Sequence, residues 1–285
     1  MNIPFKVDLK DQVAIVTGAG GILCSEMAKA LALCGAKVVV ADRTLESAQN
    51  IVKEIENLGG QAMAVVFDVL NKGEIIKAKN EIMTKWGKID LLINGAGGNS
   101  PLATTTMENC MPDTLSNKKE GDVTFFDLPL ENMRWVMDLN LFGTILPCQV
   151  FGEEMVKAQK GNIINLSSMN AFIPLTKIPM YSAGKAAVSN FTQWLATHLA
   201  PVGIRVNAIA PGFFETHQNE KLLRNEDGSY SARANKIILG TPMAKFGVPQ
   251  DLIGSILFLA SDEASGFISG INMPIDGGYS AYSGV

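Results

Sequence analysis

The chain has 285 residues, of which 47% are hydrophobic and 18% are charged. This length and composition are enough for one large folded domain with a sizeable core. Lysine and arginine number 24 against 28 acidic residues, so the formal net charge is −4 and a nucleic-acid partner is not expected. The first residues contain no apolar signal core and no run of 18 apolar residues occurs, so we expect no membrane partner and a cytoplasmic location.

The cysteine pattern argues against a metal site. The four cysteines, Cys24, Cys34, Cys110 and Cys148, form no C-x-x-C pair and no metal-ligand spacing. Cys24 and Cys34 fall in one apolar segment that is predicted to be helical, where buried free thiols are expected rather than a disulfide.

The first predicted strand, 12–17, runs into a glycine-containing turn and then into a helix that ends near Gly35. A strand, a turn and a helix start in this order offer bare backbone N–H groups and the positive end of a helix to a phosphate. We therefore expect the phosphate cradle of a cofactor here. The residues expected to form it are Gly18, Gly21, Ile22 and Leu23.

The second predicted strand, 37–43, ends with an acidic and a basic residue side by side. A carboxylate at this strand end can accept both ribose hydroxyls of an adenosine, and its charge repels a 2′-phosphate. Asp42 therefore indicates NAD as the cofactor. Arg43 leaves an alternative open, because its guanidinium could pair with a 2′-phosphate or stack on adenine.

Helices and strands then alternate regularly. We expect a helix over 45–58, a strand over 62–67, a helix over 75–86 and a strand over 89–93. Such alternation predicts one parallel sheet with helices on both faces. The predicted fold class is therefore α/β, a single-domain doubly wound parallel sheet of the Rossmann type.

The alternation stops at 98–126, a polar segment without clear periodicity. It is longer than an ordinary connection in a compact α/β domain. The segment is either a disordered insertion or a cover for the active site. Its start directly after the turn at 94–97 favours a lid or a substrate-contacting loop.

A serine, a tyrosine and a lysine follow at informative spacings. The apolar strand predicted over 162–166 leads to Ser168, and a helix is predicted from Tyr181 to about residue 198. Tyr181 and Lys185 are four residues apart, so they share one face of that helix. A lysine cation one turn away lowers the pKa of a phenol, and a tuned phenol can exchange a proton with a carbonyl or alcohol oxygen.

Ser168, Tyr181 and Lys185 at these spacings resemble the short-chain dehydrogenase/reductase family, which carries a hydride between NAD(P) and a carbonyl or alcohol. The resemblance covers essentially the whole chain. It implies that Ser168 holds the reacting oxygen and that Tyr181 is the general acid or base. It also implies that Lys185 lowers the phenol pKa and holds the nicotinamide ribose. Asn140, in an N-x-x-G pattern, would anchor a proton relay, and Ser167 competes with Ser168 for the serine role.

Further motifs imply further cofactor contacts. The turn at 94–97 resembles the family's N-A-G turn, residues 68–69 would touch the adenine, and 211–216 matches the nicotinamide-binding pattern P-G-x-x-x-T. The implied cofactor-binding residues are Asp68, Val69, Asn94, Ala96, Gly97, Tyr181, Lys185, Pro211, Gly212, Phe214 and Thr216.

The glycine turn departs from the family pattern T-G-x-x-x-G-x-G. Ile22 and Cys24 stand where its second and third glycines belong, while Gly20 and Gly21 supply glycine one or two positions early. The match to the family's phosphate-binding turn is therefore incomplete. This departure is the only feature of the sequence that favours a different interpretation, a non-catalytic relative that binds a dinucleotide.

The remaining sequence completes a single domain over 1–285. Residues 213–246 resemble the mobile substrate lid of the family, and 271–275 resemble its last strand. Family members are usually tetramers or dimers, so the resemblance implies a homotetramer or homodimer.

The glycine turn, the 98–126 insertion and the segment 168–172 together resemble one branch of the family, the short-chain type D-mannonate oxidoreductase or fructuronate reductase. A sugar acid would need polar contacts and a cation for its carboxylate. The alternative is another sugar-acid or polyol dehydrogenase, such as one acting on gluconate. The predicted substrate residues are Asn99, Ser168, Asn170 and Tyr181, and the candidate cations are Lys118, Lys119, Arg134, Lys177, Lys221 and Arg224.

Overall fold

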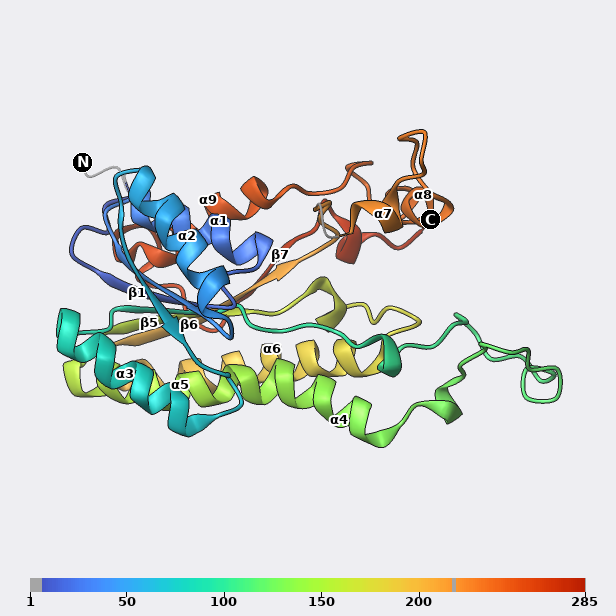
Figure 1. Cartoon of the computed structure of the whole chain (residues 1–285), viewed down its shortest axis with the longest axis horizontal. Coiled ribbons are helices and arrows are strands. Elements are labelled where there is room, and N and C mark those ends of the chain that lie inside the picture. The colour runs from blue at the N-terminus through green and yellow to red at the C-terminus, as the bar shows by residue number, and fades with distance from the viewer. Residues whose placement is uncertain (1–6, 217–218, 285) are drawn as a thin grey trace.

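The structure is a computed structural model that describes residues 7–216 and 219–284 (Figure 1). Within them, seven strands form one parallel sheet: β1 (Val13–Thr17), β2 (Lys37–Asp42), β3 (Gln61–Val66), β4 (Leu91–Asn94), β5 (Gly161–Leu166), β6 (Ile204–Pro211) and β7 (Asn272–Ile275). Their order across the sheet is β3-β2-β1-β4-β5-β6-β7. The predicted doubly wound α/β fold is confirmed.

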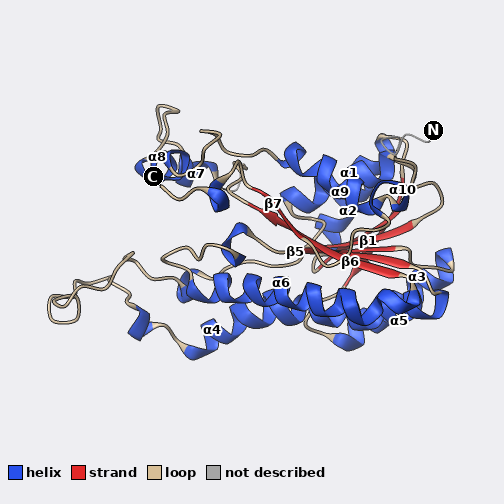
Figure 2. Ribbon diagram, turned by 180° about the vertical axis from the view of Figure 1, so that it is seen from behind, coloured by secondary structure: helices blue, strands red, loops and turns tan. Residues whose placement is uncertain are grey.

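Helices cover both faces of this sheet (Figure 2). One face carries α1 (Ile22–Leu33), α2 (Leu45–Asn57), α9 (Ile253–Ala260) and α10 (Asp262–Ser265). The other carries α3 (Lys72–Trp86), α4 (Leu130–Met137), α5 (Gly143–Ala158) and α6 (Pro179–Leu199). The short helices α7 (Glu220–Leu223) and α8 (Ala232–Leu239) lie near the C-terminal end of the chain.

The two helical layers explain why the strands are apolar without interruption. In β1, Ala14 and Val16 pack toward the layer that contains α1, while Val13 and Ile15 pack toward the layer that contains α3 and α5. Because side chains alternate along a strand, a strand covered on both faces needs apolar residues at every position. All five residues of β1 are buried.

The strand order places the site. Successive strands move outward from β1 to β3, and then the chain crosses back to β4 on the other side of β1. In a doubly wound sheet the crevice outside the carboxyl ends of the strands at this reversal binds ligands. The carboxyl end of β1 is Thr17, and the carboxyl end of β4 is Asn94, its register partner.

Asn140 lies at an interruption between two helices. A single π-helical turn, Asp138–Phe142, separates α4 from α5. Turns of this kind are rare and occur often at functional sites. The apolar pattern is continuous through this region, so it gave no indication of the interruption.

The segment 98–126 has little regular structure. Short 3₁₀ turns occur at Pro101–Ala103 and Phe125–Asp127. Between them, the Thr106 N–H donates to the Val123 carbonyl (3.0 Å), and the Val123 N–H donates to the Thr106 hydroxyl (2.9 Å). The residues beyond this neck project away from the body of the molecule (Figures 1 and 2).

The predicted lid, 213–246, contains α7 and α8 and a small apolar cluster of its own. Residues 217 and 218 of this segment, like 1–6 at the start of the chain, lie outside the described residues. Within the described part of the chain, no helix is both long and apolar enough to cross a membrane. The residues of the lid cluster are Leu223, Ala234, Ile237 and Phe246.

Candidate active site

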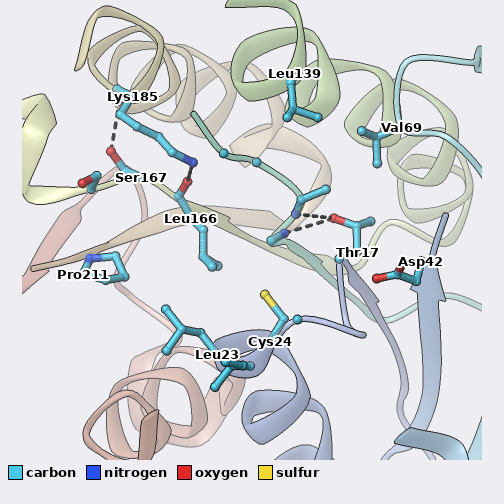
Figure 3. A pocket seen from close by; sticks show the side chains of 18 of the residues that line it. Thr17, Leu23, Cys24, Asp42, Val69, Leu139, Leu166, Ser167, Lys185 and Pro211 are labelled. Carbon is cyan, nitrogen blue, oxygen red and sulfur yellow. Dashed lines mark hydrogen bonds between the residues drawn. The ribbon is translucent and has the colours of Figure 1, made fainter. Parts of the chain in front are cut away.

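A cavity of about 570 Å³ opens at the carboxyl ends of the central strands (Figure 3). Its volume lies within the range of 300–1,000 Å³ that is typical of small-molecule and cofactor sites. Fourteen of the predicted site residues line it: Gly18, Gly21, Ile22, Leu23, Asp42, Arg43, Val69, Ala96, Gly97, Ser168, Tyr181, Lys185, Pro211 and Gly212.

The glycine turn forms a backbone cradle despite its altered spacing. The Gly21 N–H donates to the Gly18 carbonyl (3.0 Å), and α1 begins at Ile22. The first N–H groups of a helix have no partner within that helix. Gly21, at the N-cap position, has no side chain to satisfy them. Donors at the start of α1 are therefore available to a phosphate, with the favourable end of the helix dipole behind them.

Asp42 lies beside this turn and holds it. Its Oδ2 accepts a hydrogen bond from the Gly20 N–H (3.0 Å), and its Oδ1 accepts one from the Thr44 N–H (3.3 Å). A Cβ at position 20 would lie 2.8 Å from Oδ2 of Asp42 and 2.7 Å from the Cβ of Ser47. The early glycine therefore permits a close approach to the carboxylate at the end of β2.

The turn after β4 is fixed to the end of β1. The hydroxyl of Thr17 accepts hydrogen bonds from the N–H groups of Gly95 (3.0 Å) and Ala96 (3.2 Å), as Figure 3 shows. This contact keeps 95–98 against the cavity wall. Thr17 and Gly95 line the cavity but were not among the predicted site residues. A threonine immediately before the glycine turn was the available signal.

Lys185 is buried in the wall opposite the glycine turn. Only 4% of the residue is exposed, and Nζ donates to the main-chain carbonyl of Leu166 (2.7 Å; Figure 3). Nζ lies 5.7 Å from the centroid of the Tyr181 ring. Removal of water from the ammonium group lowers the pKa of Lys185 to about 8.

The pKa of Tyr181 moves in the direction opposite to the prediction. Loss of water around the phenol raises its pKa, and the neighbouring Ser168 hydroxyl opposes this only in part. The predicted net lowering of the Tyr181 pKa is therefore wrong, because desolvation outweighs the contributions that oppose it. The sequence shows that the two residues share a helix face, but the desolvation of the phenol depends on the surrounding fold.

The two adjacent serines have different surroundings. The Ser167 hydroxyl is shared with Ser189 (2.7 Å) and donates to the Lys185 main-chain carbonyl (3.1 Å), so it is bound to α6. The Ser168 hydroxyl accepts the Asn170 N–H (3.2 Å). This geometry favours Ser168 over Ser167 as the serine that meets a substrate oxygen.

Asn140 is fully buried in the π-helical turn. Its amide donates to the carbonyls of Gly98 (2.7 Å) and Val136 (2.8 Å), and its Oδ1 accepts the Gly98 N–H (3.3 Å). The side chain therefore fixes the turn beside Lys185 without lining the cavity. Its main-chain carbonyl accepts the Thr144 hydroxyl (2.9 Å).

The other predicted residues do not line the cavity, and several of them form hydrogen bonds elsewhere in the protein. Asp68 accepts the Leu70 N–H (2.9 Å), and exposed Asn99 donates to the Thr104 hydroxyl (2.8 Å). Buried Asn94 donates to Asn165 (2.8 Å). The predicted residues that do not line the cavity are Asp68, Asn94, Asn99, Asn140, Asn170, Phe214 and Thr216.

Two of these belong to the predicted lid. Phe214 lines a second cavity of about 340 Å³ next to β7, and its ring packs against Gly247. The N–H of Thr216 donates to the side chain of Asn219 (2.8 Å). The structure thus places both residues after Gly212 on a segment that leads away from the first cavity.

Several lining residues were missed because they are apolar or small. The apolar side chains among them show no chemistry in the sequence, and the surrounding fold alone places them at the cavity. Among the described residues, no group of three His, Cys, Asp or Glu side chains is arranged to hold a metal ion. The lining residues outside the predicted set are Thr17, Cys24, Ala41, Phe67, Gly95, Gly98, Leu139, Leu166 and Ser167, of which Ser167 was considered only as the competitor of Ser168.

The groups present fit a dinucleotide. One end of the cavity offers a carboxylate, Asp42, beside Arg43, and the glycine turn offers backbone N–H donors. The other end offers the buried ammonium of Lys185 and the phenol of Tyr181. A ribose, a pyrophosphate and a second ribose need donor and acceptor groups in this order.

Comparison with known proteins identifies the family. A family model described as short chain dehydrogenase matches residues 12–227. The Bacillus subtilis protein named uncharacterized oxidoreductase UxuB is 50% identical over 283 residues, which are 99% of this chain and 100% of that protein. An uncharacterized oxidoreductase of Haemophilus influenzae is 49% identical over 285 residues, which are 100% of this chain and 99% of that protein.

A crystal structure gives the same result. A Haemophilus influenzae protein, proposed to be a D-mannonate oxidoreductase and holding NAD, superposes with a TM-score of 0.93 at 49% identity. The match covers 100% of both chains. The family model covers most of the sequence, and two relatives named oxidoreductases match over nearly their whole length. This chain therefore belongs to the short chain dehydrogenase family and is an oxidoreductase.

Proposed function

We propose that this oxidoreductase interconverts a hydroxyl and a keto group on a sugar acid, with D-mannonate and D-fructuronate as the pair. One observation carries the proposal: Ser168, Tyr181 and Lys185 line the same cavity as Asp42 and the glycine turn. A proton donor for the substrate and a cradle for the cofactor therefore share one space. The Haemophilus influenzae protein proposed to be a D-mannonate oxidoreductase supports the choice of sugar acid.

The cofactor is NAD(H), which when bound supplies the hydride to the keto carbon or accepts it from the alcohol carbon. In reduction, Tyr181 donates its phenolic proton to the keto oxygen. The C–O π bond is lost, and a new C–H bond and a new O–H bond are formed. In oxidation, the Tyr181 phenolate takes that proton back. Ser168 donates a hydrogen bond to the same oxygen. Its own oxygen already accepts the Asn170 N–H, which leaves the hydroxyl hydrogen for the substrate.

Lys185 supports Tyr181 by charge and position. Its ammonium is held at the Leu166 carbonyl, close enough to the Tyr181 ring to favour the negative phenolate left after proton donation. We propose that Lys185 also binds the ribose of the nicotinamide. Asn140 holds Gly98 and is proposed to anchor the path by which a proton returns to Tyr181 from solvent.

The candidate cations for the substrate carboxylate differ in availability. Lys118 pairs with Asp127 (2.7 Å), and Arg224 makes a two-fold contact with Glu215. These pairs belong to the insertion and the lid. A cation that already has a carboxylate partner gains less from a second one, so neither is the best candidate.

Lys177 is the cation that we propose for the substrate carboxylate. It is half-buried in the segment between Ser168 and Tyr181, and its main-chain carbonyl accepts the Thr105 N–H of the insertion (2.9 Å). Asn170, in the same segment, adds a polar group. Within the described residues, its buried Oδ1 has no hydrogen-bond partner, so a substrate hydroxyl would satisfy it.

The test is a substrate panel. Purified enzyme is assayed with NAD against mannonate, gluconate, an uncharged polyol and a hydroxysteroid, and with NADH against fructuronate. Best activity on mannonate and fructuronate is expected. Best activity on gluconate would overturn the mannonate assignment only, and best activity on the polyol or the steroid would overturn the sugar-acid proposal.

Two variants refine the test. Lys177→Met should raise KM for the sugar acid by about tenfold, the scale of one charge-assisted contact, and should leave an uncharged substrate unaffected. Lys118→Met is the matched control and should change neither. Equal effects of both variants on KM for the sugar acid would show that Lys177 does not bind the substrate carboxylate.

We also propose a homodimer or homotetramer in the cytoplasm. Exposed aromatic side chains on α4 and α6, Trp135 and Trp194, support an assembly because an interface that covered them would remove apolar surface from water. Light scattering coupled to size-exclusion chromatography gives the mass directly, and a monomer at micromolar concentration would contradict the assembly.

A further inference from the structure

Cys24 occupies the position where the third glycine of the family turn belongs. It lies in the first turn of α1, is 4% exposed and lines the cavity. Figure 3 shows its sulfur pointing away from α1. A side chain at this position must be accommodated by whatever faces the start of the helix.

Gly95 is what faces it, on the turn that follows β4. A Cβ added to Gly95 would overlap the sulfur of Cys24 and would lie 2.7 Å from the main-chain oxygen of Thr17. The backbone of Gly95 does not lie in the left-handed region. Its lack of a side chain is therefore required by space and not by conformation.

We propose that Cys24 and Gly95 form a reciprocal steric pair that replaces the third glycine and sets the distance between the start of α1 and the turn after β4. The cradle for NAD(H) lies between these two segments. In the family pattern, a glycine stands at the helix position that Cys24 occupies here. In this chain the side chain is on the helix, and the opposing turn supplies the glycine.

The chemistry of the thiol agrees with a packing role. Burial raises the pKa of Cys24 to about 12, so the group is neutral at physiological pH and is not a nucleophile. The N–H of Gly95 remains bonded to the Thr17 hydroxyl (3.0 Å). A shift of Gly95 would therefore be transmitted to the end of β1, where the glycine turn begins.

A double-mutant cycle tests the pair. The four proteins are wild type, Gly95→Ala, Cys24→Ala and the double variant, and the readouts are the Kd for NADH by fluorescence and Tm without ligand. The Thr17 contact is present in both Gly95→Ala proteins, so it cancels. Because overpacking destabilises a close contact, Gly95→Ala should weaken NADH binding about tenfold more in the wild-type background than in the Cys24→Ala background.

A matched cycle uses the other cysteine of the segment. Cys34 follows the last residue of α1, at the opposite end from Cys24. Cys34→Ala should not change the effect of Gly95→Ala on either readout. If coupling to Cys34 equals coupling to Cys24, the specific contact is overturned.

A second variant covers the case in which Gly95→Ala does not fold. Cys24→Leu enlarges the pair from the helix side. It should bind NADH about tenfold more weakly than Cys24→Ala, on the scale of overpacking. Equal affinities, or coupling in Tm without coupling in Kd, would overturn the role in the cradle. The inference rests on the proposed placement of NAD(H), and because NADH binding needs no substrate, its outcome is independent of the sugar-acid assignment.

Discussion

The ammonium group of Lys185 donates a 2.7 Å hydrogen bond to the main-chain carbonyl of Leu166, the last residue of β5. This bond joins α6, which carries Tyr181, to the strand end that leads into Ser168. The two halves of the proposed catalytic group therefore keep a fixed relative position. The same bond places a cation where water is largely excluded, and a buried cation carries a cost in stability that depends on pH.

The stability cost of burying the Lys185 ammonium gives a prediction for Lys185→Met. The pKa of Lys185 falls from 10.5 to about 8, so the folded state is penalised below pH 8 and the penalty is relieved as pH rises toward 10.5. Between pH 8 and pH 10, the free energy of unfolding of wild type should rise by about 2–3 kcal/mol relative to the variant. Urea denaturation of both proteins across this range measures the difference.

The control for this slope is Lys157→Met. Lys157 is an exposed residue whose pKa is raised by hydrogen bonds to Glu153 and Glu154. It stays protonated through the same window in folded and unfolded chains, so its replacement should leave the pH slope unchanged. A Lys185→Met slope equal to that of wild type would show that the ammonium is solvated.

Tyr181→Phe keeps the ring and removes the proton. Loss of a general acid typically lowers the rate by about 10²–10⁴, whereas NADH binding should survive because the cradle lies at the other end of the cavity. Tyr282→Phe, at an exposed tyrosine, is the control and should be silent. Turnover close to wild type in the Tyr181 variant would end the proposed mechanism.

Much of the fold followed from local sequence. The strand predicted over 162–166 is Gly161–Leu166, and the helix predicted from Tyr181 is Pro179–Leu199. Apolar strands that are covered on both faces and helices with one apolar face leave distinct patterns, so these elements are set by a few neighbouring residues. The cradle residues and Asp42 were predicted in the same way, because the glycine turn and the end of the second strand are each recognised from a few neighbouring residues.

The rest depends on contacts between distant residues. Cys24 and Gly95 are 71 positions apart, and each has an ordinary local environment. The raised pKa of Tyr181 is a property of burial, which no spacing reveals. The same holds for Asn140, whose amide engages Gly98 from across the fold. Motifs thus identified the chemistry, while the surrounding structure decided its energetics.

Trimming the insertion tests its predicted role as a lid. Residues 109–121 lie beyond the neck at Thr106 and Val123, and none of them lines the cavity. Replacing them with a short glycine-serine linker should change the free energy of unfolding by no more than about 0.5 kcal/mol and should leave NADH affinity unchanged. A raised KM for the sugar acid at unchanged NADH affinity is the result that a lid requires, and an unchanged KM would contradict it.

We expect Asp42 to set the cofactor preference, and two variants separate its charge from its hydrogen bond. Its carboxylate accepts the Gly20 N–H (3.0 Å) and repels a 2′-phosphate. Asp42→Asn keeps an acceptor for Gly20 but removes the charge, so the ratio of kcat/KM for NADH over NADPH should fall by about tenfold or more, with Tm unchanged. Asp42→Ala should narrow the ratio similarly and also lower Tm, because the glycine turn loses its support. Arg43 lines the same end of the cavity and would then favour the phosphate. A wild-type enzyme that prefers NADPH would show that Arg43, and not Asp42, governs this end of the site.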